Sequence, residues 1–146
     1  LAWATLFGDF LGEKFNTMKR FGLEGCESFI PGLKSSIDKL VDLGFTDIII
    51  GMPHRGRMNV LTNVVRKPLE VIFNEFQGKK VIDHKDEENV WGNSGDVKYH
   101  LGCSYQRAYE NGKEVRITLL PNPSHLEAVD PVLQGRVRSE QHYLGD

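Results

Sequence analysis

Three histidines lie where a predicted strand or loop gives way to the next element: His54, His100 and His125. An imidazole ring can donate or accept a proton near neutral pH, which suits acid–base chemistry. In open α/β sheets, such junctions at the carboxyl ends of strands form the ligand crevice. The positions of these histidines therefore indicate a candidate site at one edge of a sheet.

The strongest local pattern is the segment Gly51-Met52-Pro53-His54-Arg55-Gly56-Arg57. It combines one titratable donor with two permanent cations, and arginine forks match carboxylate and phosphate groups. A helix N-terminus following the turn would add a partial positive charge. We expect an anion-handling turn suited to a phosphorylated cofactor, a dicarboxylate substrate or both. The alternative is a solvated arginine-rich loop that pairs with nearby acids.

The remaining candidates also have ordinary structural explanations. His100 could be a core histidine bonded to a carbonyl group, Ser124 is explained by a helix cap, and His125 by a helix start. Cys26 and Cys103 lack CxxC spacing, which favours inert thiols in a reducing compartment. No HExxH, GxGxxG or P-loop pattern is present. A metal site built from the three histidines is possible but lacks ligand spacing.

Hydrophobic periodicity predicts the elements that position these residues. Apolar residues recur at helical spacing over 2–18 and 27–43, and Gly44 follows the second run as a C-cap. The continuous β-branched run within 45–51 predicts a strand buried on both faces. Helix, glycine cap and buried strand are together typical of the opening of an α/β sheet.

Further elements follow the arginine-rich turn. Residues 58–65 predict a short helix, and Pro68 is well placed as the first residue of the next one. Residues 77–96 predict a long polar loop. Asn111-Gly112 predicts a hairpin between strands 105–109 and 114–120, with residues 115, 117 and 119 facing inward.

The final segment predicts a helix with a capping box. Ser124 would be its N-cap and Glu127 would reach back to it. Pro131 either kinks that helix or begins a second one capped by Asp130.

Composition narrows the class of protein. The chain has 146 residues, 40% of them hydrophobic and 26% charged, with a net charge of −2. These values argue against a general nucleic-acid or membrane-surface binder, and no apolar run approaches the ~20 residues of a membrane span. The first residues carry neither an initiator methionine nor a basic targeting region, and the last are turn-like. We expect an internal fragment of a longer protein.

Four blocks, in order and spacing, resemble the E1 component of the 2-oxoglutarate dehydrogenase complex: 19–25, 51–59, 95–102 and 122–128. The resemblance implies a single incomplete domain over 1–146. Residues 1–44 would form a helical lead-in, and 45–146 the first part of a thiamine-diphosphate-binding α/β domain. That domain is expected to contain part of an open, mostly parallel sheet flanked by helices, the N-terminal half of the thiamine-diphosphate-binding fold.

The resemblance also implies roles for individual residues. His54 and His100 would be catalytic and would bind the 2-oxo acid substrate. Ser124 would contact both substrate and cofactor, whereas Arg55 and Leu126 would contact the thiamine diphosphate. No metal ligand falls in the chain, because the family's Mg²⁺–diphosphate motif would begin downstream of Asp146.

The implied activity is oxidative decarboxylation of 2-oxoglutarate, with transfer of the succinyl group to a lipoyl group of the E2 partner. E3, a homodimer and the mitochondrial matrix belong to the same expectation, with no nucleic acid and no membrane as partners. The isolated fragment is expected to be inactive and to bind neither Mg²⁺ nor thiamine diphosphate productively. Three alternatives remain: a 2-oxoadipate dehydrogenase E1 paralogue, an interaction module that docks a partner through 79–88, and a histidine-ligated metallohydrolase.

Overall fold

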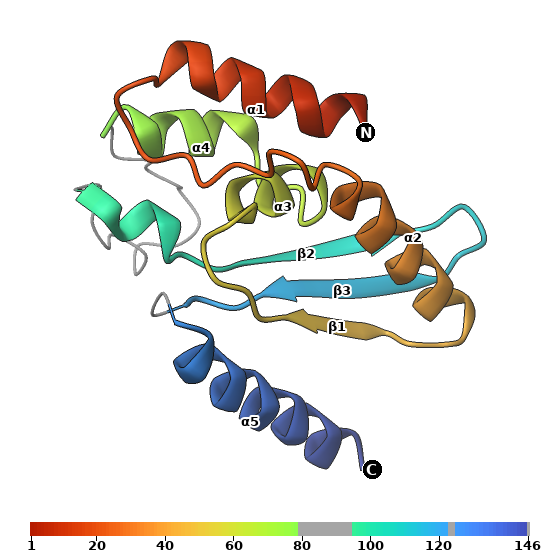
Figure 1. Ribbon diagram of the computed structural model, residues 1–146. Helices are drawn as coiled ribbons and strands as arrows, with labels where there is room; N and C mark the ends of the chain where they lie inside the picture. The colour runs from red at the N-terminus through yellow and green to blue at the C-terminus, as the bar shows by residue number, and fades with distance from the viewer. Residues whose placement is uncertain (79–94, 123–124, 146) are drawn as a thin grey trace.

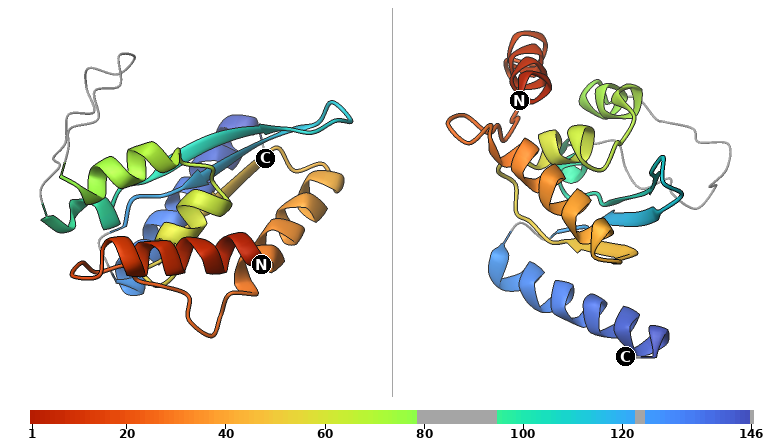
Figure 2. Two further views of the ribbon diagram at one scale, coloured as in Figure 1. Left: turned by 90° about the horizontal axis from the view of Figure 1, so that it is seen from above. Right: turned by 90° about the vertical axis from the view of Figure 1, so that its right-hand side faces the viewer.

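The computed structural model describes residues 1–78, 95–122 and 125–145. In these ranges a small sheet is covered by α1–α4 on one face and by α5 on the other (Figures 1 and 2). The elements in chain order are α1 Ala2–Lys14, α2 Phe29–Asp42, β1 Asp47–Ile50, α3 Arg57–Asn63, α4 Leu69–Phe76, the 3-10 helix η1 Gly95–Tyr99, β2 Cys103–Ala108, β3 Glu114–Leu119 and α5 Leu126–Leu144. The predicted α/β class is confirmed.

The sheet has the order β1-β3-β2. β1 runs parallel to β3, with Asp47 opposite Arg116 and Ile50 opposite Leu119. β2 pairs antiparallel with β3 through the predicted hairpin. The carboxyl ends of β1 and β3 therefore lie at the same edge, and the β1–α3 turn follows directly from it (Figure 1).

The hairpin follows its local sequence closely. Val115, Ile117 and Leu119 are fully buried while intervening residues face outward, which confirms the predicted alternation. Gly112 has φ +78°, a conformation that glycine adopts without steric cost. The Asn111 carboxamide oxygen accepts a hydrogen bond from the Lys113 amide at 3.1 Å.

The burial predicted for the first strand is wrong. All four residues of β1 are half-buried, and the strand is shorter than the run 45–51. In the described part of the chain β1 pairs with β3 alone, so it is an edge strand. α5 covers one of its faces, and the Leu133 side chain lies against Gly51, where an added Cβ would come within 3.1 Å of it.

The N-terminal helices differ in how well their patterns predicted burial. α2 buries Ile30, Ile37 and Val41, and Gly44 follows with φ +96°, as its C-cap prediction requires. α1 ends at Lys14 rather than residue 18.

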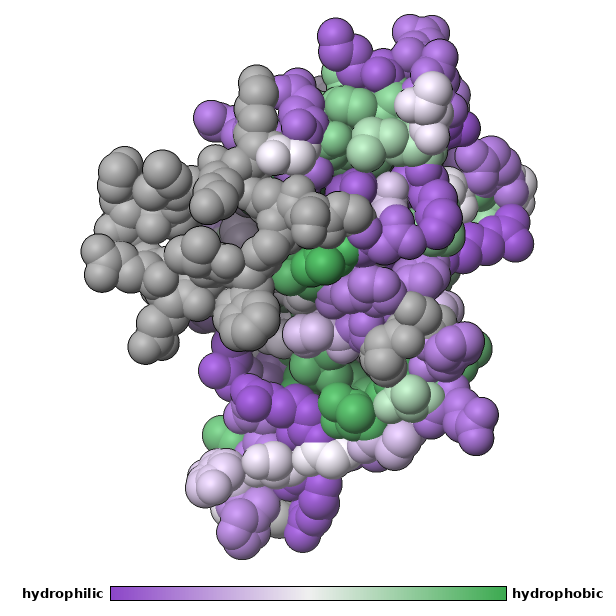
Figure 3. Space-filling view, turned by 90° about the vertical axis from the view of Figure 1, so that its left-hand side faces the viewer, coloured by the Kyte–Doolittle hydropathy of each residue, from purple (hydrophilic) through white to green (hydrophobic). Residues whose placement is uncertain are grey.

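The predicted apolar face of α1 is only partly buried. Phe7 and Leu11 are buried, whereas Trp3, Leu6 and Phe10 remain exposed. The reason is that α1 lies as an outer layer over α3 (Figure 1). Only the side facing inward is buried, at Ala4, Phe7 and Leu11. Apolar patches interrupt the polar surface, one of them at the end where α1 and α4 lie (Figure 3).

Three boundaries also differ from their predictions. Pro68 is the N-cap of α4 instead of its first residue. The predicted loop 77–96 gives way to η1 already at Gly95, and residues 79–94 lie outside the described ranges. α5 begins at Leu126 with His125 as N-cap, so the capping-box prediction at Ser124 is wrong by one residue. The helix runs through Pro131 without starting again. Within the described ranges, no helix combines the length and the apolar character needed to cross a membrane.

Candidate functional site

The fold brings His54 and His100 together from two separate segments. His54 lies in the turn between β1 and α3, and His100 directly follows η1. Their ring centroids are 5.2 Å apart with an interplanar angle of 70°, an edge-to-face arrangement. The two residues that the sequence singled out for chemistry therefore form one cluster, here called the histidine pair.

An aromatic wall supports this histidine pair. The Phe21 ring stacks on His54 with centroids 4.5 Å apart, and Tyr99 packs edge-on against Phe21 at 5.0 Å. The Phe21 carbonyl also accepts a hydrogen bond from the Gly56 amide at 2.7 Å. The Tyr99 hydroxyl donates to the Lys19 carbonyl. Phe21 thus holds the turn of His54 in place. No local pattern marks Phe21 as a site residue, but it lies within the block 19–25 that carries the family resemblance.

The surroundings of His54 favour the neutral form of its ring. Burial lowers its pKa from 6.5, and the positive charges of His100, Arg57 and Lys19 lower it further, while Asp96 opposes them. Its Nε2 atom is buried and has no hydrogen-bond partner among the described residues. An unsatisfied buried polar atom costs about 1–3 kcal/mol. A hydrogen bond to this atom would remove that cost.

His100 is held through its other ring nitrogen. Its Nδ1 lies 2.8 Å from the Asn122 backbone carbonyl and 3.2 Å from the Asn122 Oδ1. Because a carbonyl oxygen can only accept, Nδ1 carries the proton. The prediction that His100 is bonded to a carbonyl group is therefore confirmed. The same ring also lies beside His54.

Arg57 corrects one prediction. It was expected to help handle an anion, yet its side chain is 1% exposed. Its guanidinium donates to three backbone carbonyls: Met52 at 3.2 Å, Leu101 at 2.8 Å and Leu120 at 2.7 Å. These carbonyls belong to the turn of His54, the turn after His100 and the end of β3. Arg57 is therefore a brace between the segments that carry the pair.

The charge of Arg57 also affects the electrostatics of the site. Burial lowers its pKa to about 10, so the group remains cationic at neutral pH. No carboxylate of the described residues forms an ion pair with it; its charge is stabilised by carbonyl dipoles. This buried cation disfavours protonation of His54 and attracts an anion to the site.

The remaining predicted site residues are less closely involved. Arg55 is exposed and donates to the Glu24 carbonyl at 3.0 Å, with Cys26 Sγ at 3.9 Å. No hydrogen bond or ion pair in the described part of the chain joins it to the histidine pair. Leu126 is 54% exposed at the start of α5. Ser124 lies outside the described residues.

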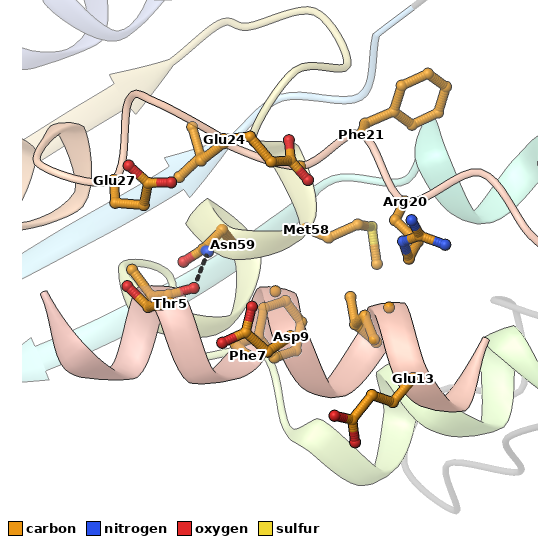
Figure 4. Close-up of a pocket in the computed structure, with 16 residues that line it drawn as sticks. Thr5, Phe7, Asp9, Glu13, Arg20, Phe21, Glu24, Glu27, Met58 and Asn59 are labelled. Atoms are coloured by element: carbon orange, nitrogen blue, oxygen red, sulfur yellow. Dashed lines mark hydrogen bonds between the residues drawn. The ribbon is translucent and has the colours of Figure 1, made fainter. Parts of the chain in front are cut away.

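A separate groove of about 470 Å³ lies between α1 and residues 20–24, with Met58 and Asn59 on its far side (Figure 4). Four carboxylates line it: Asp9, Glu13, Glu24 and Glu27. Arg20 donates to the Phe15 and Asn16 carbonyls near the end of α1. This acidic lining disfavours an anionic ligand, so the groove is not the anion site. Among the described residues, no three histidine, cysteine or acidic side chains are grouped to hold a metal ion.

Fold and site together define part of an α/β protein with a paired-histidine site at the edge of its sheet. No protein-family model matches the chain. The whole chain is 54% identical to a segment of "2-oxoglutarate dehydrogenase, mitochondrial" of Dictyostelium discoideum. It is 56% and 55% identical to proteins of the same name from Schizosaccharomyces pombe and Saccharomyces cerevisiae. It spans about 14% of the length of these relatives. Over its whole length the chain is therefore homologous to one segment of the 2-oxoglutarate dehydrogenase family.

Proposed function

We propose that this segment is the substrate-binding side of a 2-oxoglutarate dehydrogenase E1 and that His54 and His100 bind the 2-oxo acid. The observation that carries the proposal is the histidine pair: two rings 5.2 Å apart, with the buried Arg57 close enough to lower the pKa of His54. The identity to relatives that bear the enzyme's name supports the substrate.

The chemistry of the pair fits a dicarboxylate. Imidazole groups can bond the substrate carboxylate and the oxygen that gains charge during reaction. His54, kept neutral by its surroundings, can offer an N–H without bringing a competing charge, and its buried Nε2 has no partner among the described residues. The positive charge of Arg57 attracts the anionic substrate. In this proposal His54 and His100 bind and orient the acid, and their rings donate or accept protons during the reaction.

The proposal also includes thiamine diphosphate as the cofactor. Thiamine diphosphate supplies the electron sink that decarboxylation of a 2-oxo acid requires. We assign contacts with it to Arg55, Ser124 and Leu126; Arg55 retains donors beyond the bond to Glu24, and the exposed Leu126 offers an apolar surface. In this proposal residues 45–146 form the first part of the thiamine-diphosphate-binding fold. The Mg²⁺ ligands come from another part of the protein.

The remaining assignments follow from the activity. The succinyl group passes to a lipoyl group on E2, and E3 reoxidises that lipoyl group. The complete enzyme is a homodimer in the mitochondrial matrix, a location supported by the "mitochondrial" in the relatives' names.

The test replaces each histidine in the complete enzyme. We expect His54→Ala and His100→Ala each to lower kcat/KM for 2-oxoglutarate by roughly two orders of magnitude, as when a positioned acid–base group is removed. His142→Ala is the matched control, since His142 is exposed on α5. Unchanged turnover in both pair variants would instead favour the interaction module. Faster turnover of 2-oxoadipate than of 2-oxoglutarate would assign the paralogue.

A further inference from the structure

The histidine pair depends on one buried amide that lies outside the arginine-rich turn. Asn122 follows β3 by three residues, and its side chain is 4% exposed. Its backbone amide donates to the His100 carbonyl at 3.1 Å, while its backbone carbonyl accepts from His100 Nδ1 at 2.8 Å. The main chain of Asn122 therefore holds both the backbone and the ring of His100.

The side chain of Asn122 spans the two segments of the site. Its Nδ2 donates to the Met52 carbonyl at 2.5 Å, two residues before His54. That bond assigns the opposite atom, Oδ1, to the side facing His100 Nδ1 at 3.2 Å. One carboxamide thus contacts the turn of one histidine and the ring of the other.

We propose that Asn122 is a positioning residue that fixes the tautomer of His100 and the spacing between His100 and His54. This inference rests on the proposed function. With the Nδ1 proton committed to Asn122, the lone pair of the neutral ring lies on Nε2, so proton exchange takes place at that atom. Arg57 braces the same three segments through backbone carbonyls, whereas Asn122 contacts a histidine ring directly.

Two substitutions in the complete enzyme separate positioning from packing. Asn122→Ala removes the bonds to Nδ1 from Oδ1 and to Met52, and a misplaced group of this kind lowers kcat by up to roughly 100-fold. Asn122→Asp keeps the shape, loses the donor to the Met52 carbonyl and places a carboxylate beside Nδ1–H. The added negative charge favours positive charge close to it, so we expect the kcat/KM profile of this variant to move to higher pH.

The charged groups around the pair are unchanged in these variants: Lys19, Asp96 and Arg57. Asn59→Ala is the matched control because Asn59 is also a buried asparagine, 6% exposed, bonded to the Ala4 carbonyl at 2.8 Å. It should lower the melting temperature without moving the pH profile or kcat.

The outcomes distinguish the two proposals. A shifted profile in Asn122→Asp, with a larger loss of kcat in Asn122→Ala than in Asn59→Ala, supports the positioning role. An unmoved profile and equal losses overturn that role alone, provided His100→Ala remains impaired. If His100→Ala retains full turnover, the proposed function and this inference both fall.

Discussion

Replacing Arg57 tests whether a buried cation braces the histidine pair. Arg57 is 1% exposed, and its three hydrogen bonds join Met52, Leu101 and Leu120. In Arg57→Met the carbonyls of Leu101 and Leu120 lose this donor, while Met52 keeps the bond from Asn122. An unsatisfied buried carbonyl costs about 1–3 kcal/mol, so the direct loss is roughly 2–6 kcal/mol.

An opposing effect reduces that loss. Methionine no longer requires a charge to be buried, and in a protein a buried charge costs up to several kcal/mol even when relaxation is allowed. We therefore expect a net decrease of roughly 2–4 kcal/mol in the free energy of unfolding. Arg57→Lys keeps the charge but cannot reproduce the planar fork, so it should lose much of the same stability.

The two variants differ in their effect on His54. Because Arg57 helps to lower the pKa of His54, its removal in Arg57→Met lets that pKa rise toward 6.5, while Arg57→Lys retains the charge. Thermal unfolding of the complete enzyme measures the stability, and the pH profile of kcat/KM measures the titration. Arg136→Met is the control, since the exposed Arg136 pairs with Glu140 one turn along α5 and should change stability by under about 0.5 kcal/mol. Wild-type melting in both Arg57 variants would refute the brace.

Two further predictions concern the same site. Because the pKa of His54 is lowered, the unfolded chain takes up a proton before the folded one as pH falls below 6.5, so stability should fall through that window and fall less in His54→Phe; melting curves on either side of pH 6.5 check this. Gly102→Ala would place a Cβ 2.6 Å from the Leu119 carbonyl oxygen and 2.9 Å from the Pro121 nitrogen, and overpacking of this kind costs about 1–3 kcal/mol. Gly135→Ala, in α5 with nothing within 4 Å, should instead raise stability by about 0.5–1 kcal/mol, and equal effects in the two variants would contradict the reasoning.

Local patterns in the sequence were sufficient for most of the secondary structure. The Asn-Gly turn and the alternation of Val115, Ile117 and Leu119 predicted the hairpin, because turn geometry and period-two burial are encoded in neighbouring residues. Gly44 likewise predicted the end of α2. The two histidines could be nominated from residue type and position, and the four blocks indicated the family to which the comparisons also point.

Tertiary structure alone decided what Arg57 and Asn122 do. The acceptors of Arg57 at Leu101 and Leu120 lie 44 and 63 residues away, and Asn122 reaches Met52 across 70 residues. A local pattern of charges carries no information about such partners, so it predicts an anion ligand at Arg57 and does not mark Asn122. The same holds for burial. The apolar run of β1 could not show that the strand lies at a sheet edge, since burial depends on which elements pack against it. Residue types determined which groups could do chemistry, and long-range hydrogen bonds determined which of them meet.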